Sequence, residues 1–311
     1  MQKVSKSRSK LATKKTHARA KVANDKSAGK YINPRTDFGF KYIYRIKRFL
    51  INFLNAMLVI DGGIADLTYI DTEQEGRSED DRTNRFDLRC TTGKGEHIII
   101  EMQNHSQEHF IDRAFYYTAC AIQNQNIKGK DADEKEWDYK LSPVYSVNIL
   151  NFCLSQGKEG KYLTCVQLFD IHTRKIFTDK MTVVFLELPR FTKTSRYLKT
   201  DIEQWTYVLK NLDNLDNMPD TLDNEIFRDL FHSAEVAKLS KKKRAEYDQS
   251  LKDYRNMNLA IRERDIKIAE RDGRIVTMSR DIADRDQKIA DRDQRIKELE
   301  LQLQSVEQRK L

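Results

Sequence analysis

Apolar residues recur at the spacing of an α-helix between positions 40 and 57. Because Thr36 can accept a hydrogen bond at a helix N-terminus, the pattern predicts a helix from about 37 to 58. The turn-forming residues at 61–63 predict its end. Residues 107–127 carry a second amphipathic pattern, which predicts another helix.

Shorter apolar runs predict the strands of a sheet. The run that begins at Pro143 is largely apolar and β-branched, so we expect it in the centre of the sheet. The order of helix, three strands, helix and strand predicts an α/β domain whose mixed sheet is flanked by helices. The other predicted strands are 64–72, 84–91, 96–103, 163–171 and 181–188.

The C-terminal region has a different pattern. Residues 235–311 contain no proline and one glycine and are rich in charge, which predicts a long helix. Isoleucine recurs every seven residues from Ile261 to Ile296, a spacing typical of coiled coils, and residues 282–288 and 289–295 are nearly identical. The second apolar position of most heptads is replaced by Arg or Asp. Two interpretations stay open: a weak coil that forms homo-oligomers, and a solvated single helix held by Asp/Arg pairs.

The charge of the chain is concentrated at its N-terminus. Residues 1–30 hold eight Lys and two Arg against one Asp, so the rest of this +8 chain sums to about −1. The tail has no aromatic residue, and we expect it to be disordered. It is either an arm that binds the phosphates of nucleic acid or a tail without a dedicated partner. The predicted parts are the basic tail 1–30, an α/β domain 31–200, a helical extension 201–260 and a heptad helix 261–311.

The composition predicts a cytoplasmic protein. No apolar stretch reaches the length of about 18 residues that a transmembrane helix needs. The basic N-terminus is not followed by the apolar segment of a secretory signal. The cysteines form no CxxC pair, so we expect reduced, mostly buried thiols at Cys90, Cys120, Cys153 and Cys165.

Two neighbouring strands bring acidic residues together. Residues 84–91 and 96–103 predict a hairpin whose three-residue turn is Gly93-Lys94-Gly95. With Lys94 at the centre of the turn, Asp87 lies directly opposite Glu101. Their Cβ atoms are then about 4.5–5.5 Å apart on one face of the sheet.

This pair predicts a metal site. Opposed carboxylates repel each other unless a cation such as Mg²⁺ lies between them. Gln103 points to the same face as Glu101, because side chains alternate along a strand. It can orient a water or hold a phosphate, but it cannot act as a base. The alternative is that Asp87 and Glu101 face solvent and pair with Arg85 and Arg89.

The second predicted helix adds candidate ligands for a substrate. Arg113 and Tyr117 share a helix face, and Tyr116 lies at the i, i+3 position from Arg113. These residues either contact phosphate or orient Gln103. The alternative is that Tyr116 and Tyr117 are half-buried aromatic residues of the core.

Five sequence blocks carry a resemblance to a known family. They are "TDFGFKYIY" (36–44), "FLNAML" (53–58), "RFDLRCTTGKGEHIIIEMQ" (85–103), "RAFYYTACAI" (113–122) and "LSPVYSVNILNF" (141–152). In this order and at this spacing they resemble the PD-(D/E)XK nuclease family transposases, also called recombination-promoting nucleases. The resemblance covers about residues 31–260, without the basic tail and most of the heptad region.

The resemblance implies a restriction-endonuclease-like core and Mg²⁺-dependent hydrolysis of DNA during recombination or transposition. The protein would then associate with the nucleoid when it binds DNA. Asp87 and Glu101 match the two acids of the motif, both metal ligands. Gln103 stands where the wider superfamily usually has lysine, although glutamine is common in this family. A catalytically weak or inactive DNA-binding protein on a nuclease-like fold is therefore the alternative function.

The resemblance also extends to the first helix. Asp37 matches a motif acid and is a further metal candidate, with helix capping as the alternative. Lys41, Arg113 or a second metal could replace the missing lysine charge. Lys41, Arg113 and Tyr117 are therefore the expected substrate-binding residues.

Overall fold

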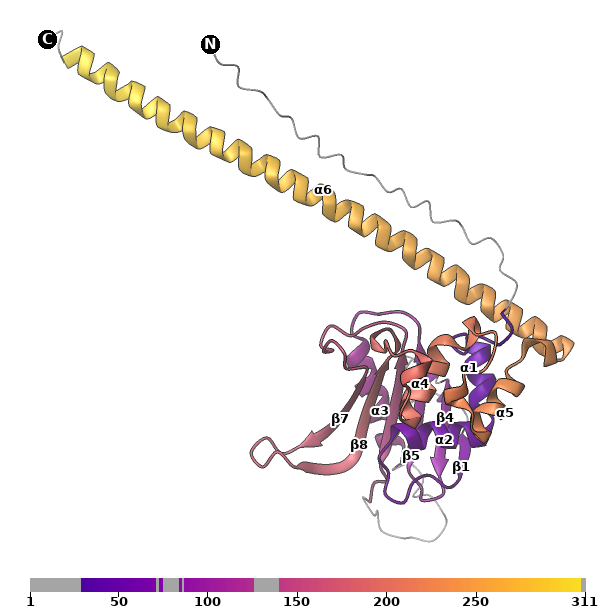
Figure 1. Cartoon of the computed structure of the whole chain (residues 1–311). Helices are drawn as coiled ribbons and strands as arrows, with labels where there is room; N and C mark the ends of the chain where they lie inside the picture. Colours follow the sequence, from indigo (N-terminus) through magenta and orange to yellow (C-terminus); the bar gives the residue numbers. More distant parts are fainter. Residues whose placement is uncertain (1–28, 71–72, 75–83, 86, 126–139, 309–311) are drawn as a thin grey trace. The chain divides into compact units, whose positions relative to one another are not determined.

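The computed structural model describes residues 29–70, 73–74, 84–85, 87–125 and 140–308 (Figure 1). Nearly all of the predicted basic tail lies outside the described residues. The chain divides into two compact units, Met1–Arg244 and Ala245–Leu311. Within the described ranges, no helix combines the length and the hydrophobicity that a membrane crossing requires.

The first predicted helix is two helices, α1 (Asp37–Tyr44) and α2 (Lys47–Met57), so the prediction of one continuous helix is wrong. Thr36 caps α1 as predicted, because its Oγ1 accepts a hydrogen bond from the Gly39 N–H at 3.0 Å. Phe40 and Phe49 lie about half a turn apart on a straight helix, on opposite faces. The break at Ile46, which is extended (ψ 102°), allows both rings to be buried.

A six-stranded mixed sheet has the order β1-β4-β5-β6-β8-β7. The pairs β5–β6 and β6–β8 are parallel, and the other pairs are antiparallel. The predicted strand 84–91 is split, because its first residues pair in a separate two-stranded sheet. The strands are β1 (Leu67–Ile70), β4 (Leu88–Thr92), β5 (His97–Gln103), β6 (Val144–Leu150), β7 (Leu163–Phe169) and β8 (Ile176–Glu187), with β2 (Glu73–Gln74) and β3 (Asn84–Arg85) in the small sheet.

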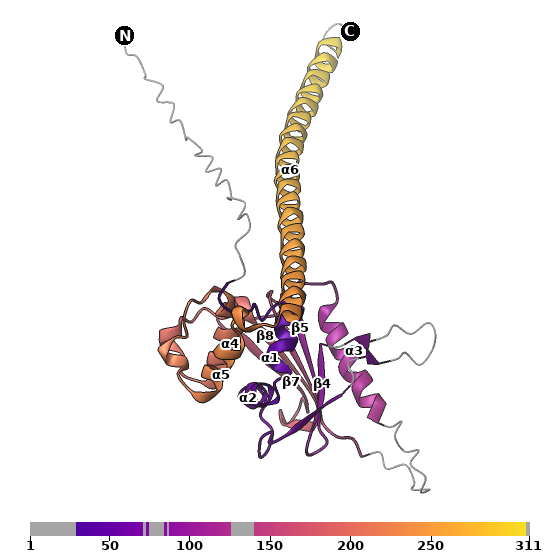
Figure 2. The same ribbon diagram turned by 90° about the vertical axis from the view of Figure 1, so that its right-hand side faces the viewer.

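Helices cover both faces of the large sheet, which gives the predicted α/β fold. Helix α3 (Phe110–Gln123) lies on one face, and α1, α2, α4 (Asp201–Asn211) and α5 (Glu225–Ser233) lie on the other (Figure 2). The 3-10 turns of this unit include η2 (Leu188–Arg190), η3 (Ser195–Tyr197), η4 (Leu212–Asn214), η5 (Asp220–Leu222) and η6 (Val236–Lys238).

Each face of the sheet has its own core. On the α3 side, Phe110 and Ala114 pack with Leu150 and Phe185 of the parallel strands. On the other side, the fully buried Trp205 of α4 has ring centroids of Tyr44, Phe53 and Phe227 within 5.9 Å. Helix α4 is therefore part of the same core as α1 and α2.

The cysteines differ from the expected burial. All four are free thiols, and Cys90 is buried on β4. Cys153, in the loop after β6, and Cys165, on the edge strand β7, are exposed, so the prediction of mostly buried thiols is wrong. Apolar neighbours in the sequence did not distinguish an edge strand from a central one.

The second unit consists mainly of α6 (Lys241–Gln308), the long helix that the sequence predicted. The first four residues of α6 belong to the first unit. Its isoleucines at positions 268, 275, 282, 289 and 296 are 46–59% exposed.

Candidate active site

The β4–β5 hairpin has the predicted register. Leu88 pairs with Ile100, Arg89 with Ile99 and Cys90 with Ile98. In the turn, the Thr92 N–H donates to the Glu96 carbonyl at 2.9 Å, and Gly95 adopts a positive φ of 84° that glycine accommodates without strain. Continued by one residue beyond β4, this register sets Asp87 opposite Glu101.

Asp87, Glu101 and Gln103 are connected at the carboxyl end of β5. The Met102 N–H donates to Asp87 Oδ2 at 2.7 Å, and Gln103 Nε2 donates to Glu101 Oε2 at 3.2 Å. The other carboxylate oxygen, Glu101 Oε1, is buried and has no hydrogen-bond partner among the described residues. Glu101 is 8% exposed, so the alternative in which both acids face solvent is wrong.

Both carboxyl groups hold their protons more strongly than usual. Burial raises the pKa of Glu101 to about 8, and the nearby Asp87 carboxylate adds to the shift, while the Gln103 hydrogen bond and Arg113 oppose it. Burial also raises the pKa of Asp87, against the Met102 N–H and the charge of Lys41. Without a cation, the pair therefore resists carrying two negative charges.

Asp37 and Lys41 approach this pair from α1. Their side chains form an i, i+4 ion pair at 2.7 Å, and the Asp37 side chain is 66% exposed. Lys41 lowers the pKa of Asp87 and Asp37 raises it. Thr36 rather than Asp37 caps the helix. Within the described part of the chain, no three His, Cys, Asp or Glu residues form a metal-ligand group, so Asp37 does not complete such a group with Asp87 and Glu101.

Arg113 approaches from α3. Its charge lowers the pKa of Glu101, and its Nη1 donates to Gln107 Oε1. The guanidinium also lies 5.4 Å from the centre of the Phe110 ring. Arg113 therefore interacts electrostatically with Glu101 and by a hydrogen bond with Gln107 in the loop before α3.

The two tyrosines of α3 have different surroundings. Tyr117 packs against the buried cluster of Ile99, Ala121 and Val144, as expected of a half-buried aromatic residue. Tyr116 is 58% exposed, so the same expectation is wrong for it. Neighbouring residues on a helix point about 100° apart, and only one of the two can face the sheet.

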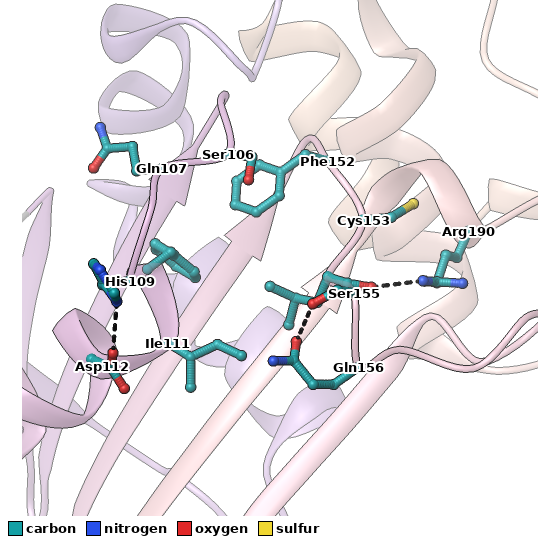
Figure 3. A pocket seen from close by; sticks show the side chains of 12 residues that line it. Ser106, Gln107, His109, Ile111, Asp112, Phe152, Cys153, Ser155, Gln156 and Arg190 are labelled. Carbon is teal, nitrogen blue, oxygen red and sulfur yellow. Dashed lines mark hydrogen bonds and ion pairs between the residues drawn. The ribbon is translucent and has the colours of Figure 1, made fainter. Parts of the chain in front are cut away.

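A pocket of about 650 Å³ lies at the carboxyl edge of the parallel strands (Figure 3). The residues before and at the start of α3 form one side of it, and the loop after β6 together with Arg190 forms the other. Gln107, which binds Arg113, is one of its lining residues. Asp87, Glu101 and Gln103 do not line the pocket, which is linked to them through Gln107 and Arg113. It lies at the edge where parallel α/β sheets bind ligands.

The sequence did not indicate the ion pair that shapes this pocket. Glu187 ends β8 with no exposed surface, and its Oε2 accepts from the Leu154 N–H and from Arg190 Nε, each at 2.7 Å. Arg190 Nη2 donates to the Leu154 carbonyl at 2.9 Å. A Cβ at Gly157 would lie 2.8 Å from both side chains, so glycine lets the loop approach. The only sequence signal was an acid at the end of an apolar strand.

The donor set at the acids fits a hard divalent cation. Mg²⁺ binds carboxylate oxygens and keeps several waters, so two protein carboxylates are sufficient protein ligands for it. The unpartnered oxygen of Glu101 and the raised pKa values of the pair are what a cation would relieve. Asp87 and Glu101 are therefore the residues that would hold such an ion.

A comparison with protein families matches residues 34–264 to the family described as PD-(D/E)XK nuclease family transposase. Comparison with curated proteins and with solved structures gives no significant match. The family match spans α1 to the first part of α6 and includes both acids.

Proposed function

Because the chain belongs to the PD-(D/E)XK nuclease family transposases, we propose that it is a Mg²⁺-dependent DNA endonuclease that acts in DNA recombination or transposition. The observation that carries the proposal is the pair of Asp87 and Glu101, with one buried carboxylate oxygen left without a partner. A buried, unpartnered carboxylate is costly for a fold and is typical of functional sites.

Asp87 and Glu101 would hold the ion. Asp37 forms no ligand group with them in this structure and would become a further ligand only by turning from Lys41 toward the ion. When bound, the ion supplies Lewis-acid stabilisation of charge at the scissile phosphate and lowers the pKa of a bound water. The Met102 N–H fixes one oxygen of Asp87, and the Gln103 amide fixes one oxygen of Glu101. These two contacts orient the carboxylates before substrate binds.

Gln103 has a positioning role in this proposal. Its amide nitrogen is directed to Glu101, and its carbonyl oxygen can accept a hydrogen bond from the attacking water. An amide has no proton to take up near neutral pH, so Gln103 orients water or phosphate and does not act as a base.

The cations near the acids would bind the DNA strand. Lys41 and Arg113 influence the pKa values of Asp87 and Glu101 from two different helices, so the charges flank the pair. They would replace the lysine that the wider superfamily has at the position of Gln103. Tyr117, whose ring packs against the buried cluster of Ile99, Ala121 and Val144, would contact the phosphate or orient Gln103.

The proposal is tested by plasmid cleavage with and without Mg²⁺. Wild-type protein is expected to nick or linearise the plasmid only with the metal. Asp87→Asn and Glu101→Gln keep the shape of each side chain, and each should lower cleavage by at least ~10³-fold, about 4 kcal/mol in the barrier. Glu96→Gln, at the opposite end of the same hairpin, is the matched control and should cut normally. Cleavage that survives in both site variants would refute the assignment.

Gln103 favours one alternative, a DNA-binding protein on a nuclease-like fold that cuts weakly or not at all. In that case the wild-type protein binds DNA with a steep salt dependence but does not cleave it with Mg²⁺. Gln103→Lys restores the cation of the wider superfamily. Cleavage gained only in this variant would favour the alternative over the nuclease.

A further inference from the structure

Helix α6 has an apolar stripe that the described residues of its own unit leave exposed. Every seventh residue is isoleucine, and Leu303 continues the series after Ile296. We propose that α6 pairs with the α6 of a second copy of this chain in a parallel, two-stranded coiled coil. The stripe residues are Ile268, Ile275, Ile282, Ile289, Ile296 and Leu303, and each is 46–64% exposed.

The stripe corresponds to one core position of a coiled coil. In the heptad abcdefg, the isoleucines occupy position a, where β-branched residues favour two strands. Position d is apolar at Met278, Leu299 and Val306 and is otherwise arginine. A pair of helices leaves position d partly open to water, and arginine can lay its apolar stem along the seam there. A trimer or tetramer would bury these charges more deeply, so the pattern fits a dimer.

The flanking charges determine the orientation of the two helices. Position e is acidic in every complete heptad but one, and position g is basic in every heptad from 261 to 295 but one. An antiparallel pair sets e against e and g against g, which brings like charges together. A parallel pair sets g against e of the next heptad on the partner, which brings opposite charges together. The e residues are Asp265, Asp272, Ser279, Asp286, Asp293 and Glu300, and the g residues are Lys267, Arg274, Asp281, Lys288 and Arg295.

Most of the resulting parallel contacts are attractive. Lys267 meets Asp272, Lys288 meets Asp293 and Arg295 meets Glu300 of the other copy. Asp281 meets Asp286, which is the one like-charge contact, and Arg274 meets Ser279. The register is set at position d, because Met278 and Leu299 each meet their own equivalent only when the helices are in phase.

The competing interpretation was a single helix held by pairs within itself. The ion pairs described between 261 and 300 are Arg264–Asp265 at 3.6 Å and Arg295–Glu298 at 3.0 Å. Between positions 282 and 293, no arginine or lysine forms an ion pair with an acid of the same helix among the described residues, whereas Arg295 at the end of the second repeat does. The charges of Arg285, Lys288 and Arg292 are therefore available to a partner helix, and the single-helix interpretation is supported in these repeats by one ion pair, Arg295–Glu298.

The pairing has a functional consequence that does not depend on cleavage. Because the helices are parallel, both copies of the first unit are attached at the same end of the coil. One assembly then carries two copies of the Asp87–Glu101 site. Two active sites are what an enzyme needs to cut both strands of a duplex. A protein that only binds DNA would gain avidity from the same two-site arrangement.

The first test measures the mass of the full chain by sedimentation equilibrium. Wild-type protein should have twice the 36.6 kDa of one chain. The double variant Ile282→Asp, Ile289→Asp should have the mass of one chain. Gln287→Asp with Gln294→Asp adds the same charges at the outer f positions and should remain a dimer. A wild-type monomer, a larger oligomer or an unchanged double variant would overturn the proposal.

The second test determines the orientation. In a chain with the exposed Cys153 and Cys165 replaced by serine, Ile296→Cys should form a disulfide-linked dimer under mild oxidation. The two introduced thiols face each other only in a parallel, in-phase pair. Gln294→Cys, on the outer face, should remain unlinked. Dimers in which Ile296→Cys fails to cross-link, or in which both variants link equally, would exclude the parallel coil. Plasmid cleavage, measured separately, keeps this outcome distinct from that of the nuclease proposal.

Discussion

Three isoleucines of β5 and three of α6 show how the two units differ. Ile98, Ile99 and Ile100 are at most 1% exposed, because β5 lies between β4 and β6 and helices cover both faces of the sheet. Ile275, Ile282 and Ile289 are 55–59% exposed. The first set is buried by its own chain, whereas the second set needs a partner to be buried.

The polar residues differ in the same way. In β5, Glu101 is buried beside Asp87, and its surroundings raise its pKa to about 8. In α6, the acids and bases between 261 and 300 lie on the surface. The first unit therefore stores electrostatic strain at one site, and the second unit presents its charges for recognition.

Removing a buried isoleucine should have the largest effect on stability. Ile100→Ala leaves a cavity between packed strands, so the free energy of unfolding should fall by about 2–5 kcal/mol. Ile289→Ala removes the same atoms from an exposed stripe and should leave unfolding of the first unit unchanged. Urea denaturation followed by tryptophan fluorescence measures both, since Trp205 lies in the core of the first unit. Equal losses in the two variants would contradict the contrast.

The strain at Glu101 should appear as a pH dependence of stability without metal. Its pKa is about 8 in the folded state and about 4.3 in the unfolded chain. Between these values the folded state holds a proton that the unfolded state has released. Stability should therefore fall as the pH rises from about 4 to about 8, by at most ~1.4 kcal/mol per pH unit, and then level off.

Glu101→Gln is the matched variant for this slope. It keeps the shape of the side chain and cannot ionise, so its stability should change less with pH and should exceed that of the wild type near pH 8. Added Mg²⁺ should stabilise the wild type and not this variant. Identical pH profiles for the two proteins would show that Glu101 is not strained.

Two helix caps of the first unit, one buried and one exposed, should differ by a smaller amount. Thr36 is buried, and its Oγ1 accepts from the Gly39 N–H at 3.0 Å. Thr36→Ala should cost about 1–2 kcal/mol of unfolding free energy. At the start of α6, Ser240 accepts from the Lys243 N–H at 3.4 Å in an exposed position, so Ser240→Ala should cost less. Thermal denaturation compares the two, and a larger loss at Ser240 would reverse the expected order.

The smallest predicted effect is a gain in the stability of α6. Gly273 lies inside α6, and a Cβ added there would meet nothing within 4 Å. Gly273→Ala should stabilise the helix by about 0.5–1 kcal/mol, because alanine loses less backbone entropy. Far-UV circular dichroism during heating measures the change. Loss of helicity in this variant would mean that the glycine has a contact in the assembled protein.

The parts of the fold that depend on local signals could be predicted from the sequence. The register of β4 and β5 followed from the turn around Lys94, and this register placed Glu101 opposite Asp87. The length of α6 followed from the absence of proline and from the heptads. Both features are determined by residues close together in the chain.

The features that the sequence did not indicate depend on residues far apart in the chain. The break at Ile46 contains no glycine or proline, and it follows from the need to bury aromatic rings on two sides. Alternation showed that Glu101 and Gln103 share a face, but it did not show that the face is covered. The contact between Glu187 and the Leu154 N–H joins residues 33 positions apart, and no local pattern indicates it.

The repetition in α6 affects how the length of this protein can change. Gain or loss of one seven-residue unit moves all later residues by a whole heptad, so isoleucine stays at position a and the e and g charges keep their signs. One gene encodes both strands of the proposed pair, so both change length together and remain matched. An insertion whose length is not a multiple of seven rotates the later residues by about 100° for each added residue and separates the stripes. Duplication and deletion of the repeat can therefore adjust the helix in steps of roughly 10 Å while the partner surface is kept.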